Sequence, residues 1–217
     1  GDVDGDGLAD ILIGESTGNS NGKTYLFFGA GLLTAASHPL SNADVVFLAE
    51  NALNGQLRRA SSAGDVDGDG LSDVLLAAPY LNSDGWTSNQ GKVYLVLGAD
   101  IGSGGTFDLS FASSSFLGSE RSETGAVVSS AGDMDGDGLD DILIGAHTTG
   151  ANNGAVHLVY GASLLGGGIF DLTATAGAVF LGQNAEYAGH AIDASDVNGD
   201  GKPDLLIGGW GQQSAYV

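Results

Sequence analysis

The chain has 217 residues, of which 42% are hydrophobic, and this is enough apolar material for a buried core. Its net charge is −21 and only six residues are lysine or arginine, so no basic surface is available for nucleic acid. It contains no cysteine that could form a stabilising disulfide, and no run of about eighteen apolar residues that could insert into a membrane as a helix.

A nine-residue motif, Asp-x-Asp-Gly-Asp-Gly-x-x-Asp, occurs four times along the chain. It covers residues 2–10, 65–73 and 133–141 and, in an altered form, residues 196–204. The first aspartates of successive copies are 63, 68 and 63 residues apart. A motif that returns at a nearly fixed period indicates a repeat architecture. Most of the acidic residues belong to these copies, so the negative charge is concentrated in them.

Each motif leads directly into a short apolar run that fits a buried strand, at residues 11–13, 74–76, 142–144 and 205–207. A loop rich in glycine, asparagine and serine follows, and then a second strand at 23–28, 92–97 and 155–160, which begins again at 214–217. A longer polar connection leads to a third strand at 45–48, 115–117 and 178–181. A fourth strand, of small residues that suit a close approach of backbones, lies at 59–62, 126–129 and 190–193.

No segment has the period of a long helix. Residues 31–36 could form at most one helical turn, and the glycines of residues 164–168 favour a loop. Four strands in each period of about 65 residues predict an all-β fold, a β-propeller of four-stranded antiparallel blades. A β-solenoid is the alternative, but its repeats would be shorter. Within one propeller domain we expect a partial blade at 1–49 that starts in its motif, blades at 50–118 and 119–182, and a partial blade at 183–217.

These segments amount to about three and a half blades, whereas a propeller needs roughly four to eight blades to close into a ring. We therefore expect the ring to be completed by the rest of a longer chain, by a second copy that makes seven blades, or by another polypeptide. The first of these is favoured.

The motif has the chemistry of a calcium loop. Calcium takes six to eight oxygen ligands, and alternate residues of a tight loop can turn their carboxylates inward where glycines permit the turn. Position 7 would supply its backbone carbonyl, because its side chain varies. The absence of His and Cys argues against zinc and copper. The predicted metal ligands are Asp2, Asp4, Asp6, Leu8 and Asp10; Asp65, Asp67, Asp69, Leu71 and Asp73; Asp133, Asp135, Asp137, Leu139 and Asp141; and Asp196, Asn198, Asp200, Lys202 and Asp204.

The other well-known calcium loops do not fit. An EF-hand ends with a glutamate at position 12, where this chain has apolar residues inside predicted strands, and the RTX motif returns every nine residues. We therefore expect up to four Ca²⁺ ions in loops between strands. Binding at the fourth is expected to be weaker, because Asn198 replaces one carboxylate there.

These loops, the Tyr-Leu-Phe-Phe-Gly and Val-Tyr-Leu-Val-Leu-Gly strands, and residues 125–133, which lead into the third loop, resemble FG-GAP repeats. Such repeats are the blades of the integrin α-subunit propeller and of its bacterial relatives. The resemblance covers essentially the whole chain, and we expect a bacterial or other non-animal relative. It implies that the loop joins the first two strands of a blade and that calcium lies on the face opposite the ligand-binding face. Only the second copy keeps a proline, Pro79, at the end of the following strand, which leaves integrin partners unspecified.

The predicted function is a non-enzymatic, calcium-stabilised propeller of the extracellular space or cell surface that serves adhesion or recognition. Its protein or glycan ligand is expected on loops opposite the calcium sites, such as residues 80–91, where Trp86 and the corresponding Trp210 could contact it. The alternatives are a sugar-binding lectin and a propeller enzyme, either a hydrolase or a lyase. No catalytic residue is predicted, because the four histidines have no metal-like spacing and no nucleophile elbow occurs.

Overall fold

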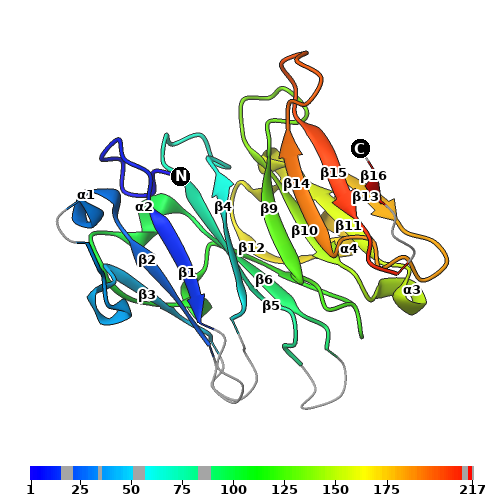
Figure 1. Cartoon of the computed structure of the whole chain (residues 1–217), viewed down its shortest axis with the longest axis horizontal. Helices are drawn as coiled ribbons and strands as arrows, with labels where there is room; N and C mark the ends of the chain where they lie inside the picture. The colour runs from blue at the N-terminus through cyan, green and yellow to red at the C-terminus, as the bar shows by residue number, and fades with distance from the viewer. Residues whose placement is uncertain (16–21, 34–35, 51–56, 83–88, 212–214, 217) are drawn as a thin grey trace.

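The part of the chain that the structure describes contains sixteen strands in four sheets. The structure is a computed structural model, and it describes all residues except 16–21, 34–35, 51–56, 83–88, 212–214 and 217. The sheets stand side by side like the blades of a propeller and form an arc that is not closed into a ring (Figure 1). The predicted all-β class and propeller architecture are confirmed.

Sheet 1 contains β1 (Ile11–Glu15), β2 (Lys23–Phe27), β3 (Val45–Leu48) and β7 (Gly105–Asp108). Sheet 2 contains β4 (Arg59–Gly64), β5 (Asp73–Ala78), β6 (Lys92–Val96), β8 (Ser114–Leu117) and β12 (Gly168–Asp171). Sheet 3 contains β9 (Val127–Gly132), β10 (Asp141–Ala146), β11 (Ala155–Val159) and β13 (Ala178–Leu181). Sheet 4 contains β14 (Ala191–Ser195), β15 (Asp204–Gly208) and β16 (Ala215–Tyr216).

The helices are short and lie in the connections between strands. The α-helices are α1 (Gly29–Leu32), α2 (Gly98–Ile101), α3 (Thr149–Asn152) and α4 (Leu172–Thr175), and the 3-10 helices are η1 (Leu40–Asn42), η2 (Leu109–Phe111) and η3 (Gly161–Leu164). The first agrees with the single turn predicted near residues 31–36, of which 34–35 lie outside the described residues. No helix among the described residues is long and apolar enough to span a membrane.

The small-residue strands β4, β9 and β14 lie next to one another at the inner edges of sheets 2, 3 and 4. They carry mainly alanine, serine, valine and glycine, so neighbouring sheets can approach each other closely along this line. Each pairs antiparallel with the apolar strand that follows its motif loop. The prediction of a small-residue strand before each of these motifs is confirmed, although all three continue two or three residues further than expected.

Three apolar clusters fill the spaces between neighbouring sheets. Phe47 of sheet 1 packs with Leu76 of sheet 2, Leu75 of sheet 2 packs with Ile144 of sheet 3, and Leu143 of sheet 3 packs with Ile207 of sheet 4. The central strands β5 and β10 are therefore buried on both faces, which explains why they read as continuous apolar runs in the sequence.

Strands β7 and β12 are missing from the sequence-based prediction, which counts fourteen strands and assigns their residues to polar connections. Each pairs in parallel with the outermost strand of the preceding sheet, β7 with β3 and β12 with β8. The predicted loop at 164–168 is accordingly wrong at its ends, because Leu164 closes η3 and Gly168 begins β12. In sequence, β7 lies in the expected segment 50–118 and β12 in the expected segment 119–182. In space, each pairs with a strand of the segment before it.

Candidate metal centres

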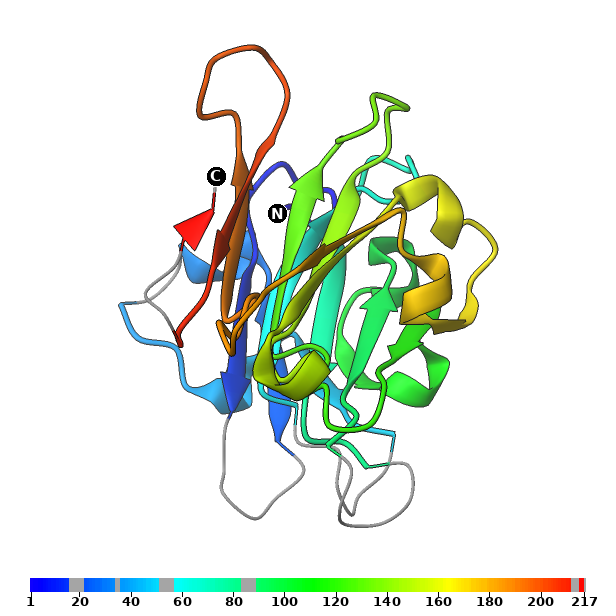
Figure 2. The same cartoon turned by 90° about the vertical axis from the view of Figure 1, so that its right-hand side faces the viewer.

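The motif loops lie at one end of the sheets (Figures 1 and 2). Three of them connect a small-residue strand to the next strand of the same sheet: β4 to β5, β9 to β10 and β14 to β15. The first leads into β1. The connections from β5 to β6 and from β10 to β11 leave the sheets at the opposite end. The structure therefore brings all four acidic loops to a single face.

The first aspartate of each motif organises the turn. In the second loop the Asp65 carboxylate accepts hydrogen bonds from the backbone N–H groups of Gly68, Asp69 and Gly70, at 2.7, 3.1 and 2.9 Å. Gly68 and Gly70 have φ values of 79° and 91°, which residues with a Cβ rarely adopt, so the turn requires glycine at positions 4 and 6. The glycines of the other loops donate in the same way to Asp2, Asp133 and Asp196.

The last aspartate ties the loop to the rest of its blade. Asp73 is fully buried, and its carboxylate accepts hydrogen bonds from Val66 N at 2.8 Å and from Gly98 N at 2.9 Å. Gly98 begins α2, and an added Cβ would lie 2.9 Å from the carbonyl oxygen of Ser72, so this close approach also needs glycine. Asp10 and Asp141 bridge the same two positions in their own repeats.

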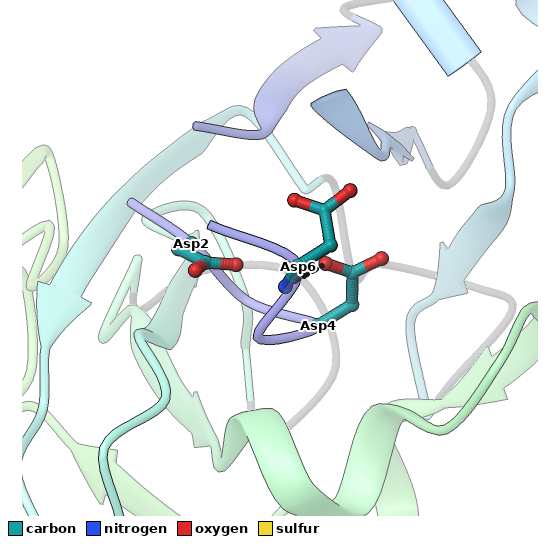
Figure 3. A group of neighbouring side chains, drawn as sticks. All are labelled: Asp2, Asp4 and Asp6. Carbon is teal, nitrogen blue, oxygen red and sulfur yellow. Dashed lines mark hydrogen bonds between the residues drawn. The ribbon is translucent and has the colours of Figure 1, made fainter. Parts of the chain in front are cut away.

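Three carboxylates converge in each of the first three loops. In each group, one ligand atom from every residue lies within 4.8 Å of the others. The three side chains of the first group come from one turn of the chain, where Asp6 N donates to Asp4 Oδ1 (Figure 3). The groups are Asp2, Asp4 and Asp6; Asp65, Asp67 and Asp73; and Asp133, Asp135 and Asp141.

The remaining predicted ligands lie in the same loops but outside these groups. The Asp69 and Asp137 carboxylates accept hydrogen bonds from the backbone N–H groups of Leu71 and Leu139 at 2.8 and 2.9 Å. Asp10 bonds to the backbone as described above. Coordination by the carbonyl groups at position 7 stays a prediction.

The fourth loop keeps the turn but does not assemble three carboxylates, although all of its residues are described. Asp196 accepts from Gly199 N and Gly201 N as in the other loops. Asn198, which replaces the second aspartate, donates from Nδ2 to Asp204 Oδ1 at 3.2 Å. The position-9 carboxylate is therefore engaged within the loop, and metal binding by Asp196, Asn198, Asp200, Lys202 and Asp204 also stays a prediction.

Burial and crowding destabilise the charged form of several loop carboxylates. Burial raises the pKa of Asp73 to about 7, although hydrogen bonds from Gly98 and Val66 oppose it, and the charges of Asp67 and Asp69 raise it further. Burial likewise raises the pKa values of Asp67 and Asp141, with added repulsion from neighbouring aspartates. A divalent cation would relieve both effects, and an all-oxygen donor set suits a hard ion such as calcium.

A group of aromatic and imidazole rings lies just beyond the ends of β10 and β15, on the face away from the motif loops. Trp210 is 69% exposed, contacts Tyr187 edge-on at 5.6 Å between ring centroids, and stacks on His190 at 6.2 Å. His147 joins the group and pairs with Glu123 at 3.3 Å between Nε2 and Oε2. The sequence singles out Trp210 but not its ring neighbours: His147 lies in the connection after β10, and Tyr187 and His190 lie in the connection between β13 and β14. Trp86 lies outside the described residues.

A cavity of about 590 Å³ opens beside this group, on the side of Glu123. Polar groups and backbone line most of it, including Arg121 and Thr148. Thr148 Oγ1 donates to the Arg121 carbonyl at 2.8 Å, which joins two of the connections that line the cavity. The face opposite the motif loops therefore offers both an exposed ring group and a polar hollow.

Comparison with known proteins identifies the repeats. The family model described as FG-GAP repeat matches residues 1–27 and 58–96, and the one described as FG-GAP-like repeat matches residues 133–207. The chain is 28% identical to integrin alpha pat-2 of Caenorhabditis elegans, with 100% of this chain and 18% of that protein covered. It is 27% identical to integrin alpha-4 of Xenopus laevis, with 96% and 19% covered.

A further relative is the phosphatidylinositol-glycan-specific phospholipase D of Homo sapiens, which is 31% identical over 73% of this chain and 20% of its own length. The chain thus spans only about a fifth of each of these relatives. All three come from animals, so the expectation of a bacterial or other non-animal relative is not supported. The chain is an FG-GAP repeat protein with a propeller of the integrin α-subunit type.

Proposed function

We propose that this chain is a calcium-stabilised propeller module of an extracellular or cell-surface protein, and that it serves adhesion or recognition without catalysing a reaction. The observation that carries the calcium role is the convergence of three carboxylates in each of three equivalent loops. Without a cation these groups repel one another, and buried Asp73 and Asp141 resist ionisation. Ion binding would then contribute directly to folding free energy, because the unfolded chain has no such loop.

The recognition role is supported by the similarity to integrin α-subunits and by the ring group around Trp210. Exposed aromatic rings beside a polar hollow suit binding to a protein side chain or a sugar ring. We place the ligand site on this face, away from the motif loops. A sugar-binding lectin is the more specific form of the same proposal.

The alternative is a propeller enzyme, and one observation favours it, namely the similarity to a protein named as a phospholipase D. That similarity covers only 20% of the phospholipase D. A panel of hydrolase and lyase substrates tests this alternative, and turnover that disappears in a variant of Glu123 or His147 would support it over the recognition role.

The calcium role is tested by counting bound ions and measuring stability. The protein is loaded with calcium, dialysed, and analysed by native mass spectrometry and thermal unfolding. Asp67→Asn should remove one ion and lower the melting temperature by several degrees, because a cation site is linked to folding. The matched control is Asp193→Asn, which removes an exposed acid of β14 outside the loops and should leave both values unchanged. An unchanged ion count in Asp67→Asn would show that this loop is not a calcium site.

The recognition role needs a separate readout, such as binding to a glycan array and to immobilised extracellular-matrix proteins. Trp210→Ala should abolish the binding found there, while Leu33→Ala, which removes another exposed apolar side chain, should not. Binding that survives Trp210→Ala would move the ligand site away from the ring group.

A further inference from the structure

The outermost strands β3 and β8 are each covered by a short strand supplied by the following repeat. β7 runs parallel to β3 with Gly105 opposite Val45 and Asp108 opposite Leu48. β12 runs parallel to β8 with Gly168 opposite Ser114 and Asp171 opposite Leu117. The two covering strands share the sequence Gly-x-Phe-Asp and are both followed by leucine.

Each residue of this pattern makes the same contact in both places. The glycine N–H donates to the backbone carbonyl just before the covered strand, at 2.6 Å to Asp44 and 3.0 Å to Ser113. The aspartate carboxylate accepts from the backbone N–H two residues on, which starts the turn after the strand. The leucine that follows, Leu109 or Leu172, is 2% exposed and joins the apolar cluster between two sheets.

The phenylalanine makes the most specific contact. Phe107 lies against Phe47 with 5.8 Å between ring centroids, and Phe170 stacks on Phe116 at 5.6 Å. As a result, Phe47 and Phe116 are both fully buried. Aromatic pairs of this kind stabilise a contact beyond the burial of their surface alone.

β13 is the equivalent outermost strand of sheet 3, and within the described part of the chain it pairs only with β11. Its sequence, Ala-Val-Phe-Leu, repeats the Val-Val-Phe-Leu of β3 and the Ser-Ser-Phe-Leu of β8. Phe180, the counterpart of Phe47 and Phe116, is 37% exposed, and Leu181 is 71% exposed. Among the residues that the structure describes, the apolar cluster between sheets 3 and 4 also contains no counterpart of Leu109 or Leu172.

We propose that the edge of β13 binds one further extended segment with the pattern Gly-x-Phe-Asp-Leu, in parallel register. Its glycine lies opposite Ala178, its phenylalanine packs on Phe180, and its leucine enters the space between sheets 3 and 4. An unpaired strand edge offers a row of backbone hydrogen-bonding groups, and addition of a strand satisfies them. The side chains of β13 then select the aromatic residue. This site is independent of the cation loops.

The probe is a fluorescein-labelled synthetic peptide with the sequence of residues 104–110, which includes β7 and its leucine. Fluorescence anisotropy with the calcium-loaded full chain should show saturable binding of one peptide per protein. Replacing the peptide's phenylalanine by alanine should weaken binding about tenfold or more, because a buried aromatic contact is lost. Since this variant is made in the peptide, its outcome does not depend on the folding of the protein.

On the protein side, Phe180→Ala should weaken binding to a similar extent. The matched control is Phe111→Ala, because Phe111 is 76% exposed in η2 and lies outside β13. Equal binding by the Phe180→Ala protein, or equal binding of the alanine peptide, would overturn the proposal. So would the absence of binding at millimolar peptide, or dimerisation of the protein that the peptide does not compete with.

The register is tested by disulfide cross-linking, which is clean because the chain has no cysteine of its own. Leu181→Cys should cross-link to a peptide that carries cysteine at its aspartate position, by analogy with Leu48 opposite Asp108. It should not cross-link to a peptide in which cysteine replaces the glycine that corresponds to Gly105. The reverse preference would show antiparallel binding and contradict the proposed register.

Discussion

At the residue scale, one buried polar side chain, His157, distinguishes the third repeat from the two before it. The third residue of β11 is His157, which lies opposite Val179 of β13, whereas the corresponding residues of β2 and β6 are Tyr25 and Tyr94. His157 is 5% exposed, lies opposite Ile144 of β10, and its Nδ1 atom has no hydrogen-bond partner among the described residues. The imidazole of His157 is therefore buried on the side of sheet 3 that packs against sheet 2.

This burial predicts a pH-dependent stability. Burial lowers the pKa of His157 below its usual 6.5 in the folded state, so below that pH the unfolded chain binds a proton that the folded chain resists. The free energy of unfolding should then fall as the pH drops from 6.5 through the folded-state pKa. His157→Tyr, which copies the other repeats, should flatten this slope in urea unfolding at fixed calcium between pH 7 and 5. Equal slopes in the two proteins would contradict the assignment.

At the element scale, the parallel covering strands β7 and β12 hold neighbouring repeats together. Each belongs in sequence to one repeat and in space to the sheet of the repeat before it. A sheet that recruits a strand from the next repeat cannot separate from it without losing backbone pairing. This linkage adds to the apolar clusters between the sheets.

Removal of the aromatic contact tests this linkage. Phe107→Ala deletes the ring that packs on Phe47 and should lower the free energy of unfolding by about 1–3 kcal/mol, less than for a fully buried phenylalanine because Phe107 is only partly buried. Thr106→Ala on the same strand is the control, and its exposed side chain should contribute within about 0.5 kcal/mol. The midpoint of urea unfolding measures both, and a Phe107→Ala midpoint equal to that of the control would refute the contribution.

These two strands also mark where prediction from the sequence ends. The apolar runs at 74–76 and 142–144 reveal β5 and β10, because strands buried on both faces are apolar throughout. Gly-Thr-Phe-Asp has neither an apolar run nor an apolar alternation, and its pairing is set by a partner about 60 residues earlier in the chain. The repetition of Phe-Asp-Leu at 107–109 and 170–172 is the signal that could have identified them.

The candidate metal centres were more accessible to prediction than the opposite face. A ligand loop is a local structure, so Asp65, Asp67 and Asp73 can be found from spacing alone. The ring group is assembled from His147, Tyr187, His190 and Trp210, which come from three connections between strands and meet only after sheets 3 and 4 pack together. Its composition therefore could not be read from a periodic pattern.

At the scale of the whole molecule, the distribution of charge and apolar surface sets the conditions for stability. The net charge is −21, and four acidic loops on one face concentrate much of it there. The outer faces of the first and last sheets expose apolar side chains. Ile11 and Ile13 of sheet 1 and Leu206 of sheet 4 are 38–47% exposed, whereas their counterparts in β5 and β10 are buried. Negative charge is therefore concentrated on the face of the motif loops, and apolar surface on the two outer faces of the arc.

The charge predicts how salt and calcium act together on stability. Like charges within a Debye length, about 8 Å at physiological ionic strength, repel and destabilise the compact state, and added salt screens that repulsion. In the presence of EGTA, raising sodium chloride from 20 to 300 mM should therefore increase the melting temperature. With calcium bound, part of the loop charge is neutralised and the same increase in salt should have a smaller effect. Differential scanning calorimetry measures both series. Magnesium chloride at matched ionic strength is the control, because it screens charge as a divalent salt but is a smaller ion than the loops are expected to bind. Parallel salt dependences with and without calcium would show that the loop aspartates are not the source of the repulsion.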